Sequence, residues 1–202
     1  MKLDIKKDLL QSQLPTNKWL WKDNQPEIIR NSSLDVELPL SKENDLVMRK
    51  LIDFVRYSQD PDLNKKENED YLRPAVGLAA PQIGSNTNMF FARFEWDVEN
   101  DDVEEYAIIN GKITANSDQI TYLSDGEGCL SVDKDHKGLV PRSYKIQVEG
   151  YDWFKQEYIE LTLRGYHAIV FQHELEHNQG KLYYDRINKE DPHYNEESWI
   201  VI

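Results

Sequence analysis

The sequence predicts an α+β fold in which short, mainly antiparallel strands surround a central helix. Several segments alternate between apolar and polar residues with the two-residue period of a half-buried strand. One segment, residues 168–171, is apolar on all sides, as expected of a helix buried in a core. An amphipathic helix on the N-terminal side and a strand at the C-terminal end complete the expected architecture.

Length and charge limit what the chain can be. Its 202 residues suffice for one domain with a sizeable core, so we expect a single domain over residues 1–202, with residues 1–40 as an extension docked on it. The net charge of −13, from 24 basic and 37 acidic residues, argues against direct DNA binding. No apolar run approaches the roughly 20 residues that span a bilayer. Residues 1–8 have no apolar signal core, and there is one cysteine, so we expect a cytoplasmic protein.

The N-terminal third is predicted to hold one long helix. Residues 1–40 mix charges and prolines with enough apolar side chains to dock on a core. From Ser41, which suits the N-cap position, the pattern becomes helical, and residues 46–55 present one broad apolar face. Residues 59–70 are polar and rich in charge, which predicts a solvated loop.

The remaining segments are predicted as strands. Residues 88–94 and 106–109 are separated by an acidic stretch, 95–105, which we expect to be a loop, and residues 120–123 form a third short strand. Residues 145–151 and 158–163 alternate in strand fashion and are expected to form a hairpin that leads into the central helix. The apolar tail, residues 198–202, is expected to end as a strand.

The central helix carries a motif for metal chemistry. His173 and His177 are four residues apart, so on a helix their imidazoles lie on the same face and can bind one metal ion. Glu174 follows the first histidine and can reach a water on the metal as a general base without being a ligand itself. Gly180 offers a stop for the helix shortly after the second histidine.

A catalytic metal of this kind usually has three protein ligands, so a third is required. The metzincin pattern is excluded because Tyr183 stands where it needs a histidine. Glu197 has the spacing of a thermolysin-like ligand, although Pro192 precedes it and the chain ends soon after. Cys129 is the remaining candidate, since a thiolate is a strong ligand for zinc or iron. A metallopeptidase that uses Glu197 and a non-enzymatic metal site are the alternatives to a catalytic site with Cys129.

Three motifs resemble those of the peptide deformylases, in the order found in that family. They are Val-Gly-Leu-Ala-Ala-Pro-Gln at residues 76–82, Glu-Gly-Cys-Leu-Ser at 127–131 and Gln-His-Glu-Leu-Glu-His at 172–177. The resemblance covers about residues 40–190 and is greatest to the longer branch of the family in low-GC Gram-positive bacteria.

Two positions depart from the family pattern. Ala75 stands where the first motif usually begins with glycine, so either the backbone is ordinary there or the loop differs. Asn178 stands where leucine is common, which concerns the packing behind the helix end. A deformylase with a shifted substrate is therefore a further alternative.

The resemblance implies a metal-dependent hydrolase that removes the N-terminal formyl group from formyl-methionyl nascent polypeptides and releases formate. This reaction belongs to N-terminal methionine processing in protein biosynthesis. The resemblance implies one divalent metal ion held by Cys129, His173 and His177, with Fe(II) as the native metal and Ni, Co or Zn able to occupy the site. The implied partner is a formylated nascent peptide at the ribosome, and we expect a monomer.

The resemblance also implies roles for the other site residues. Glu174 takes a proton from the attacking water and delivers it to the departing amine. The Gln82 side-chain amide and the Leu130 backbone N–H donate to the developing oxyanion. The peptide docks as an added strand beside residues 75–77. The implied substrate-binding residues are Val76, Gly77, Ile169 and Glu127. We expect Arg142 to be a surface residue.

Overall fold

Two sheets form the framework of the computed structural model, which describes residues 8–97 and 102–202. The larger sheet is antiparallel and has five strands, in the order β1 (Gly77–Ala79), β2 (Met89–Asp97), β3 (Asp102–Asn116), β6 (Lys145–Asp152) and β7 (Glu157–Arg164). The smaller sheet consists of β5 (Arg142–Ser143), β4 (Ile120–Tyr122) and β8 (Ile200–Val201), and only its β4–β8 pair is parallel.

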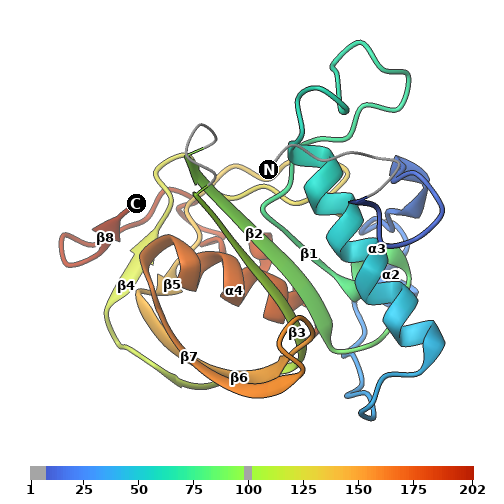
Figure 1. The fold of residues 1–202 in the computed structure, drawn as a ribbon. Helices are drawn as coiled ribbons and strands as arrows, with labels where there is room; N and C mark the ends of the chain where they lie inside the picture. The colour runs from blue at the N-terminus through green and yellow to red at the C-terminus, as the bar shows by residue number, and fades with distance from the viewer. Residues whose placement is uncertain (1–7, 98–101) are drawn as a thin grey trace.

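Two long helices pack on these strands. Helix α3 (Lys42–Gln59) lies beside β1 and β2, whereas α4 (Gly165–His177) lies within the curve of β6 and β7 (Figure 1). The shorter helical elements are η1 (Asn17–Trp19), α2 (Pro26–Ile29), η2 (Ala80–Ile83) and η3 (Tyr183–Arg186). The prediction of an α+β fold with mainly antiparallel strands is confirmed. None of the helices in the described part of the chain combines the length and apolar character needed to cross a bilayer.

Strand β2 lies between two hydrophobic clusters, which explains its continuous apolar run. Because side chains alternate along a strand, Met89 and Phe91 face the cluster that α3 contributes to, while Phe90 and Phe94 face the cluster under α4. All four side chains are essentially inaccessible to solvent. The site-bearing helix α4 and the helix α3 are therefore anchored to opposite faces of the same strand.

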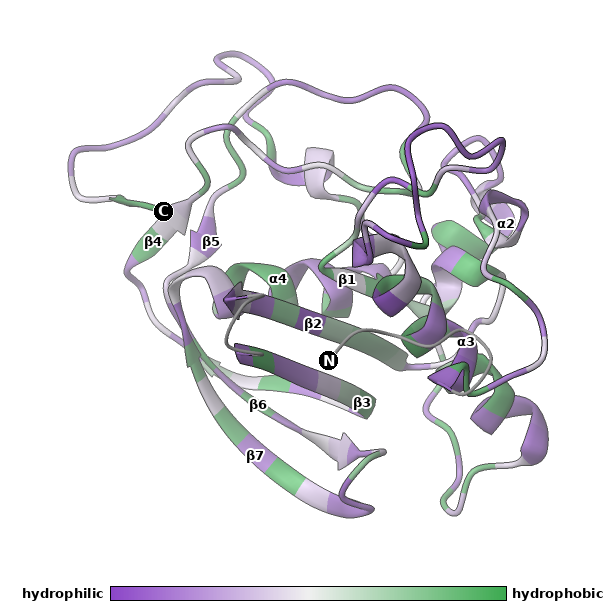
Figure 2. Ribbon diagram, turned by 45° about the horizontal axis from the view of Figure 1, so that its top comes forward, coloured by the Kyte–Doolittle hydropathy of each residue, from purple (hydrophilic) through white to green (hydrophobic). Residues whose placement is uncertain are grey.

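The ends of both long helices follow from local sequence. The Ser41 hydroxyl accepts a hydrogen bond from the Asn44 backbone N–H and caps α3, as predicted. Helix α4 begins directly after β7 at Gly165, whose φ of +55° is a left-handed conformation that glycine adopts without strain. The predicted hairpin is present, and β7 alternates between hydrophobic and hydrophilic residues along its length (Figure 2).

The acidic loop predicted between the second and third strands is wrong over most of its length. β2 continues to Asp97 and β3 begins at Asp102, and the part of the predicted loop at residues 98–101 lies outside the described residues. Two of the carboxylates are compatible with the sheet because they have partners there. Glu105 pairs with Arg56 and Arg93, and Glu104 accepts hydrogen bonds from aromatic side chains. Acidic composition alone therefore gave the wrong secondary structure.

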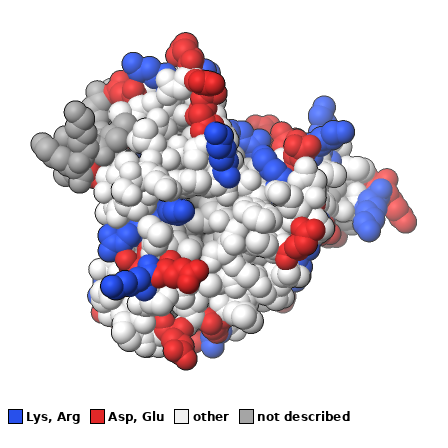
Figure 3. Space-filling model, turned by 90° about the vertical axis from the view of Figure 1, so that its right-hand side faces the viewer, with Lys and Arg blue, Asp and Glu red and all other residues white. Residues whose placement is uncertain are grey.

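Surface charge is mixed on the face of the molecule shown in Figure 3. Basic and acidic side chains are interspersed there around a broad uncharged area, without a gathered basic patch.

The ion pairs differ greatly in exposure. Arg93 keeps only 8% of its side-chain surface accessible, whereas Lys112 and Glu149, which pair across β3 and β6, keep 68% and 48%.

These differences predict unequal contributions to stability. Replacing Glu105 (E105A) leaves the nearly buried Arg93 with fewer partners, and we expect the free energy of unfolding to fall by about 2 kcal/mol. The matched control is E149A, whose exposed pair should contribute less than about 0.5 kcal/mol. Urea-induced unfolding of both variants measures the difference. Equal losses in the two would contradict the structural role of Glu105.

Candidate metal centre and substrate cavity

Three potential ligands converge between α4 and the loop after β4. The ligand atoms of Cys129, His173 and His177 all lie within 4.8 Å of one another. The Cys129 Sγ is 3.2 Å from Nε2 of His177, which is itself 3.2 Å from Nε2 of His173. One thiolate and two imidazoles that approach so closely suit a divalent transition metal such as Fe(II), Co, Ni or Zn.

The two histidines project from one face of α4, as their spacing predicted. The helix is anchored because Ala168 and Phe171 in the preceding turn are fully buried in the hydrophobic cluster that it shares with the larger sheet. After His177 the helix ends, and the Gly180 N–H bonds to the carbonyl of that histidine. The backbone of α4 thus fixes the separation of the two imidazoles.

Cys129 is buried and its sulfur accepts hydrogen bonds from two sides. The Ser131 backbone N–H donates to Sγ at 3.4 Å, and the Gln82 side-chain amide donates at 3.6 Å. The same Gln82 side chain is oriented by its carbonyl oxygen, which accepts from the Ala79 N–H at 2.8 Å. N–H donors directed at a sulfur from two sides are a common arrangement around cysteine ligands of metals, where they orient the sulfur.

A buried carboxylate connects two of the motifs. Glu127 binds Nδ1 of His173 through Oε2 at 2.8 Å, which directs the other ring nitrogen of that histidine toward Cys129 and His177. Both oxygens of Glu127 also accept hydrogen bonds from Arg142, at 2.5 and 2.8 Å. The expectation that Arg142 lies on the surface is wrong, because its side chain is fully buried between Glu127 and Glu176.

The ionisation of these groups reflects their surroundings. Burial raises the pKa of Glu127, but the charge and hydrogen bonds of Arg142 outweigh burial and lower it to about 2. Burial lowers the pKa of His173, yet hydrogen bonds with Cys129 and Glu127 prevail and raise it well above its usual value. Burial, together with the neighbouring charge of His173, lowers the pKa of His177 well below its usual value.

Glu174 differs from the other buried carboxylates because it lacks a partner. Its Oε2 atom is inaccessible to solvent and finds no hydrogen-bond donor among the described residues. Burial raises the pKa of Glu174 to about 7, where a carboxylate can both accept and release a proton near neutral pH. The backbone at Gly77 passes so close that a methyl group there would lie within van der Waals overlap of the Glu174 carboxylate.

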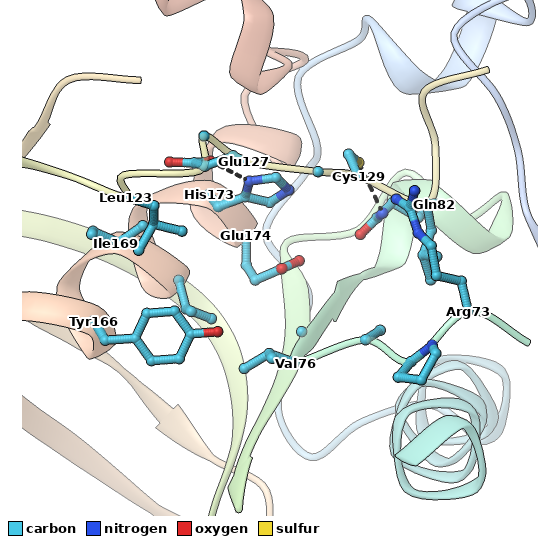
Figure 4. A pocket seen from close by; sticks show the side chains of 17 residues that line it. Arg73, Val76, Gln82, Leu123, Glu127, Cys129, Tyr166, Ile169, His173 and Glu174 are labelled. Carbon is cyan, nitrogen blue, oxygen red and sulfur yellow. Dashed lines mark hydrogen bonds and ion pairs between the residues drawn. The ribbon is translucent and has the colours of Figure 1, made fainter. Parts of the chain in front are cut away.

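A cavity of about 280 Å³ opens beside these groups. Figure 4 shows Tyr166, Ile169 and Leu123 on one side of it and Gln82 and Cys129 on the other, with Glu174 between them. The remaining lining residues include Arg73, Val76, Gly77, Glu127, Leu130, Val170 and His173.

One wall of the cavity is formed by residues 74–77, which lead into an edge strand. β1 pairs only with β2 in the described structure, so the other edge of this segment faces the cavity. The backbone N–H of Leu130, on the opposite wall, donates to no acceptor among the described residues. Unpaired backbone groups on both walls can bind an extended peptide.

All ten residues that the sequence predicted for the site are found in one place. Nine of them line the cavity, and the tenth, His177, belongs to the ligand cluster with Cys129 and His173. The nine are Val76, Gly77, Gln82, Glu127, Cys129, Leu130, Ile169, His173 and Glu174. Glu197, the alternative third ligand, is exposed and does not belong to the cluster. Tyr166 and Arg73 were missed. Their neighbours along the chain carry no pattern that indicates a cavity.

The two departures from the family motifs are accommodated. Ala75 does not have a positive φ, its N–H donates to the Ser58 hydroxyl, and its methyl group packs in the cluster under α3. The backbone at that position is therefore ordinary. Asn178 is buried. Its backbone carbonyl accepts a hydrogen bond from the Ser33 N–H, and its side-chain oxygen accepts one from the Ser33 hydroxyl, so polar contacts with the N-terminal segment replace apolar packing.

Comparison with known proteins agrees with the motifs. The family model for polypeptide deformylases matches residues 17–193. Peptide deformylase 2 of Bacillus cereus is 43% identical over 165 residues, which cover 82% of this chain and 86% of that protein. Peptide deformylase 2 of Bacillus subtilis is 41% identical, with 90% and 95% covered. The crystal structure of peptide deformylase from Thermus thermophilus superimposes with a TM-score of 0.63 at 27% identity, covering 85% of this chain and 86% of that chain.

The geometry predicts which residues retain a metal. C129S should lower metal affinity by more than about 100-fold, because it removes the one thiolate from the cluster. E197A should bind metal as the parent does. Inductively coupled plasma mass spectrometry of anaerobically purified proteins gives the metal content of each. Loss of metal in E197A and retention in C129S would instead favour the metallopeptidase alternative.

Proposed function

The chain belongs to the polypeptide deformylase family, whose members are enzymes that remove the N-terminal formyl group from nascent peptides, and from this premise we propose a metal-dependent hydrolysis that releases formate. The single observation that carries the proposal is the unpartnered Glu174 carboxylate beside the Cys129, His173 and His177 cluster at the wall of one cavity.

Cys129, His173 and His177 would hold one divalent metal ion. Its chemistry when bound is that of a Lewis acid that polarises a carbonyl and makes water a stronger acid. A donor set of one sulfur and two nitrogens leaves room for non-protein ligands, as catalytic sites require. We propose Fe(II) as the native metal, with Ni, Co or Zn as substitutes.

Glu174 would move the proton during hydrolysis. Its carboxylate takes a proton from the water that attacks the formyl carbon, and the C–O bond forms as the carbonyl π-bond opens. It then delivers that proton to the peptide nitrogen as the carbonyl re-forms and the C–N bond breaks. The products are a free amine and formic acid, which loses its remaining proton to the solvent and leaves as formate. A pKa raised by burial suits this double role, since both forms of the carboxyl group are accessible near neutrality.

Two N–H groups would stabilise the negative charge that develops on the formyl oxygen. The Gln82 amide is held in place by the Ala79 N–H and lies at the cavity wall beside Cys129. The Leu130 N–H lies at the same wall. Donors that are oriented before the reaction lower the barrier, because no reorganisation is needed when the charge forms.

The peptide would bind as an added strand beside residues 75–77. Ser58 and Gln59 already engage the Ala75 N–H and carbonyl, so the pairing would fall on Gly77. Its first side chain, methionine, would enter the apolar side of the cavity between Val76, Ile169 and Tyr166. Glu127 also lines the cavity, but Arg142 and His173 already engage its carboxylate, so we assign it to orienting the site. The backbone pairing would accept varied sequences after the methionine.

We further propose that the chain is a single domain that acts as a monomer in the cytoplasm on peptides leaving the ribosome. The mixed charge on the face in Figure 3 offers no broad basic surface there for RNA. Contact with the ribosome on that face would therefore have to be local.

Replacing Glu174 by glutamine (E174Q) tests the base. The variant keeps the shape of the side chain but cannot accept the proton, so kcat/KM for formate release from formyl-Met-Ala-Ser should fall by at least about 100-fold. Metal content should remain that of the parent, because Glu174 is not a ligand. Near-parental turnover by a metal-loaded E174Q would overturn the assigned role, and absence of formate release by the loaded parent would overturn the proposed function.

Replacing Gly77 by alanine (G77A) tests the position of the base. The added methyl group must displace the Glu174 carboxylate, and a misplaced base should lower kcat/KM by about 100-fold. The displaced group is the flexible end of a side chain, so the unfolding temperature and metal content should change little. These two measurements are the control. A fully active G77A would show that Glu174 does not need this position.

A further inference from the structure

Residues 21–23, here called the N-terminal clamp, make three consecutive contacts behind the site. The Trp21 N–H donates to the Gln82 carbonyl at 2.8 Å, and the Asp23 N–H donates to the Ser131 carbonyl at 2.8 Å. Between them, Nζ of Lys22 donates to the Leu130 carbonyl at 2.7 Å, across 108 residues of sequence. The clamp thus contacts the backbone of both loops that face Cys129.

The Lys22 contact falls on one particular peptide group. The Leu130 carbonyl and the Ser131 N–H belong to the same peptide unit, and this N–H donates to the Cys129 sulfur at 3.4 Å. The lysine, the peptide unit and the sulfur therefore form a continuous chain of hydrogen bonds. Lys22 is half-buried, whereas Leu130, Ser131 and Cys129 are buried, so water screens the peptide unit and the sulfur weakly.

Charge on Lys22 acts on the sulfur through this chain. An ammonium that binds a carbonyl oxygen draws electron density through the conjugated peptide bond and makes its N–H a stronger donor. The stronger N–H in turn holds more of the negative charge of the thiolate. Among the described residues Lys22 has no ion-pair partner, and the Asp23 carboxylate beside it is engaged by the Asp133 N–H and the Tyr184 hydroxyl.

We propose that Lys22 is a positioning residue that tunes Cys129 as a metal ligand through the Leu130–Ser131 peptide. With Lys22 in place the thiolate donates less charge to the metal, which leaves the metal a stronger Lewis acid for the formyl carbonyl. This inference rests on the proposed function, since it assumes that Cys129 binds the metal.

The test is the near-ultraviolet spectrum of the Co(II)-loaded protein, in which a thiolate ligand gives a sulfur-to-cobalt charge-transfer band. Removing the positive charge raises the energy of the sulfur electrons, so the band of K22M should move to longer wavelength. K22R, which keeps the charge, should show the parental band. The matched control is K18M, which removes an exposed lysine of the same segment and should leave the band unchanged.

Activity provides a second readout of the same variants. We expect kcat/KM for formate release to fall by about tenfold in K22M and to be restored in K22R. K22Q keeps a donor without the charge and provides the same spectral test if K22M does not fold.

The outcomes separate the inference from the function on which it rests. A parental band in a folded K22M or K22Q, with or without a lower unfolding temperature, would show a merely structural lysine and overturn the proposal. Absence of the band from the Co(II)-loaded parent would overturn the Cys129 metal site and the Lys22 proposal with it. A shifted band in the neutral variants and a restored band in K22R would support both.

Discussion

The Glu127 carboxylate is the contact on which the site depends. It binds Arg142 and His173 at the same time and so joins the cysteine loop, β5 and α4 at one buried point. Burying charged groups is unfavourable unless they are paired, and here Glu176 and Arg186 extend the network, so two arginines face two glutamates. The arrangement leaves Nε2 of His173 no orientation except toward the other two ligands.

The balanced network also accounts for the behaviour of Glu174. The Arg142 guanidinium is already shared between Glu127 and Glu176, and Arg186 binds Glu176. Glu174 projects from the same helix into the cavity, where it meets no donor among the described residues, and burial raises its pKa. A paired carboxylate next to an unpaired one therefore gives one fixed anion and one group that can exchange protons.

Local spacing made much of this predictable from sequence. The helical spacing of His173 and His177 is enough to predict that they lie on one face of a helix. The apolar residues of α3 and of the β6–β7 hairpin likewise repeat with the helical or strand period within single segments. β1 is three residues long and too short for any period, although it forms a wall of the cavity. Arg142 was misjudged because its partners lie 15 and 34 residues away, and only the fold brings them together. The same applies to the acidic β2–β3 ladder, where the pairing residue Arg56 lies on α3.

The N-terminal segment shows how far this dependence on the fold extends. Its sequence carries no motif, yet Trp21 and Lys22 contact the backbones of Gln82 and Leu130, and Ser33 contacts Asn178 at the end of α4. Gln82, Leu130 and Asn178 belong to or directly follow the three motifs. A backbone carbonyl accepts a hydrogen bond whatever its side chain, so such contacts leave little trace in the sequence on either side. The positions proposed to carry the chemistry are thus readable as motifs, whereas the contacts of the N-terminal segment with two of the motif loops are visible only in three dimensions.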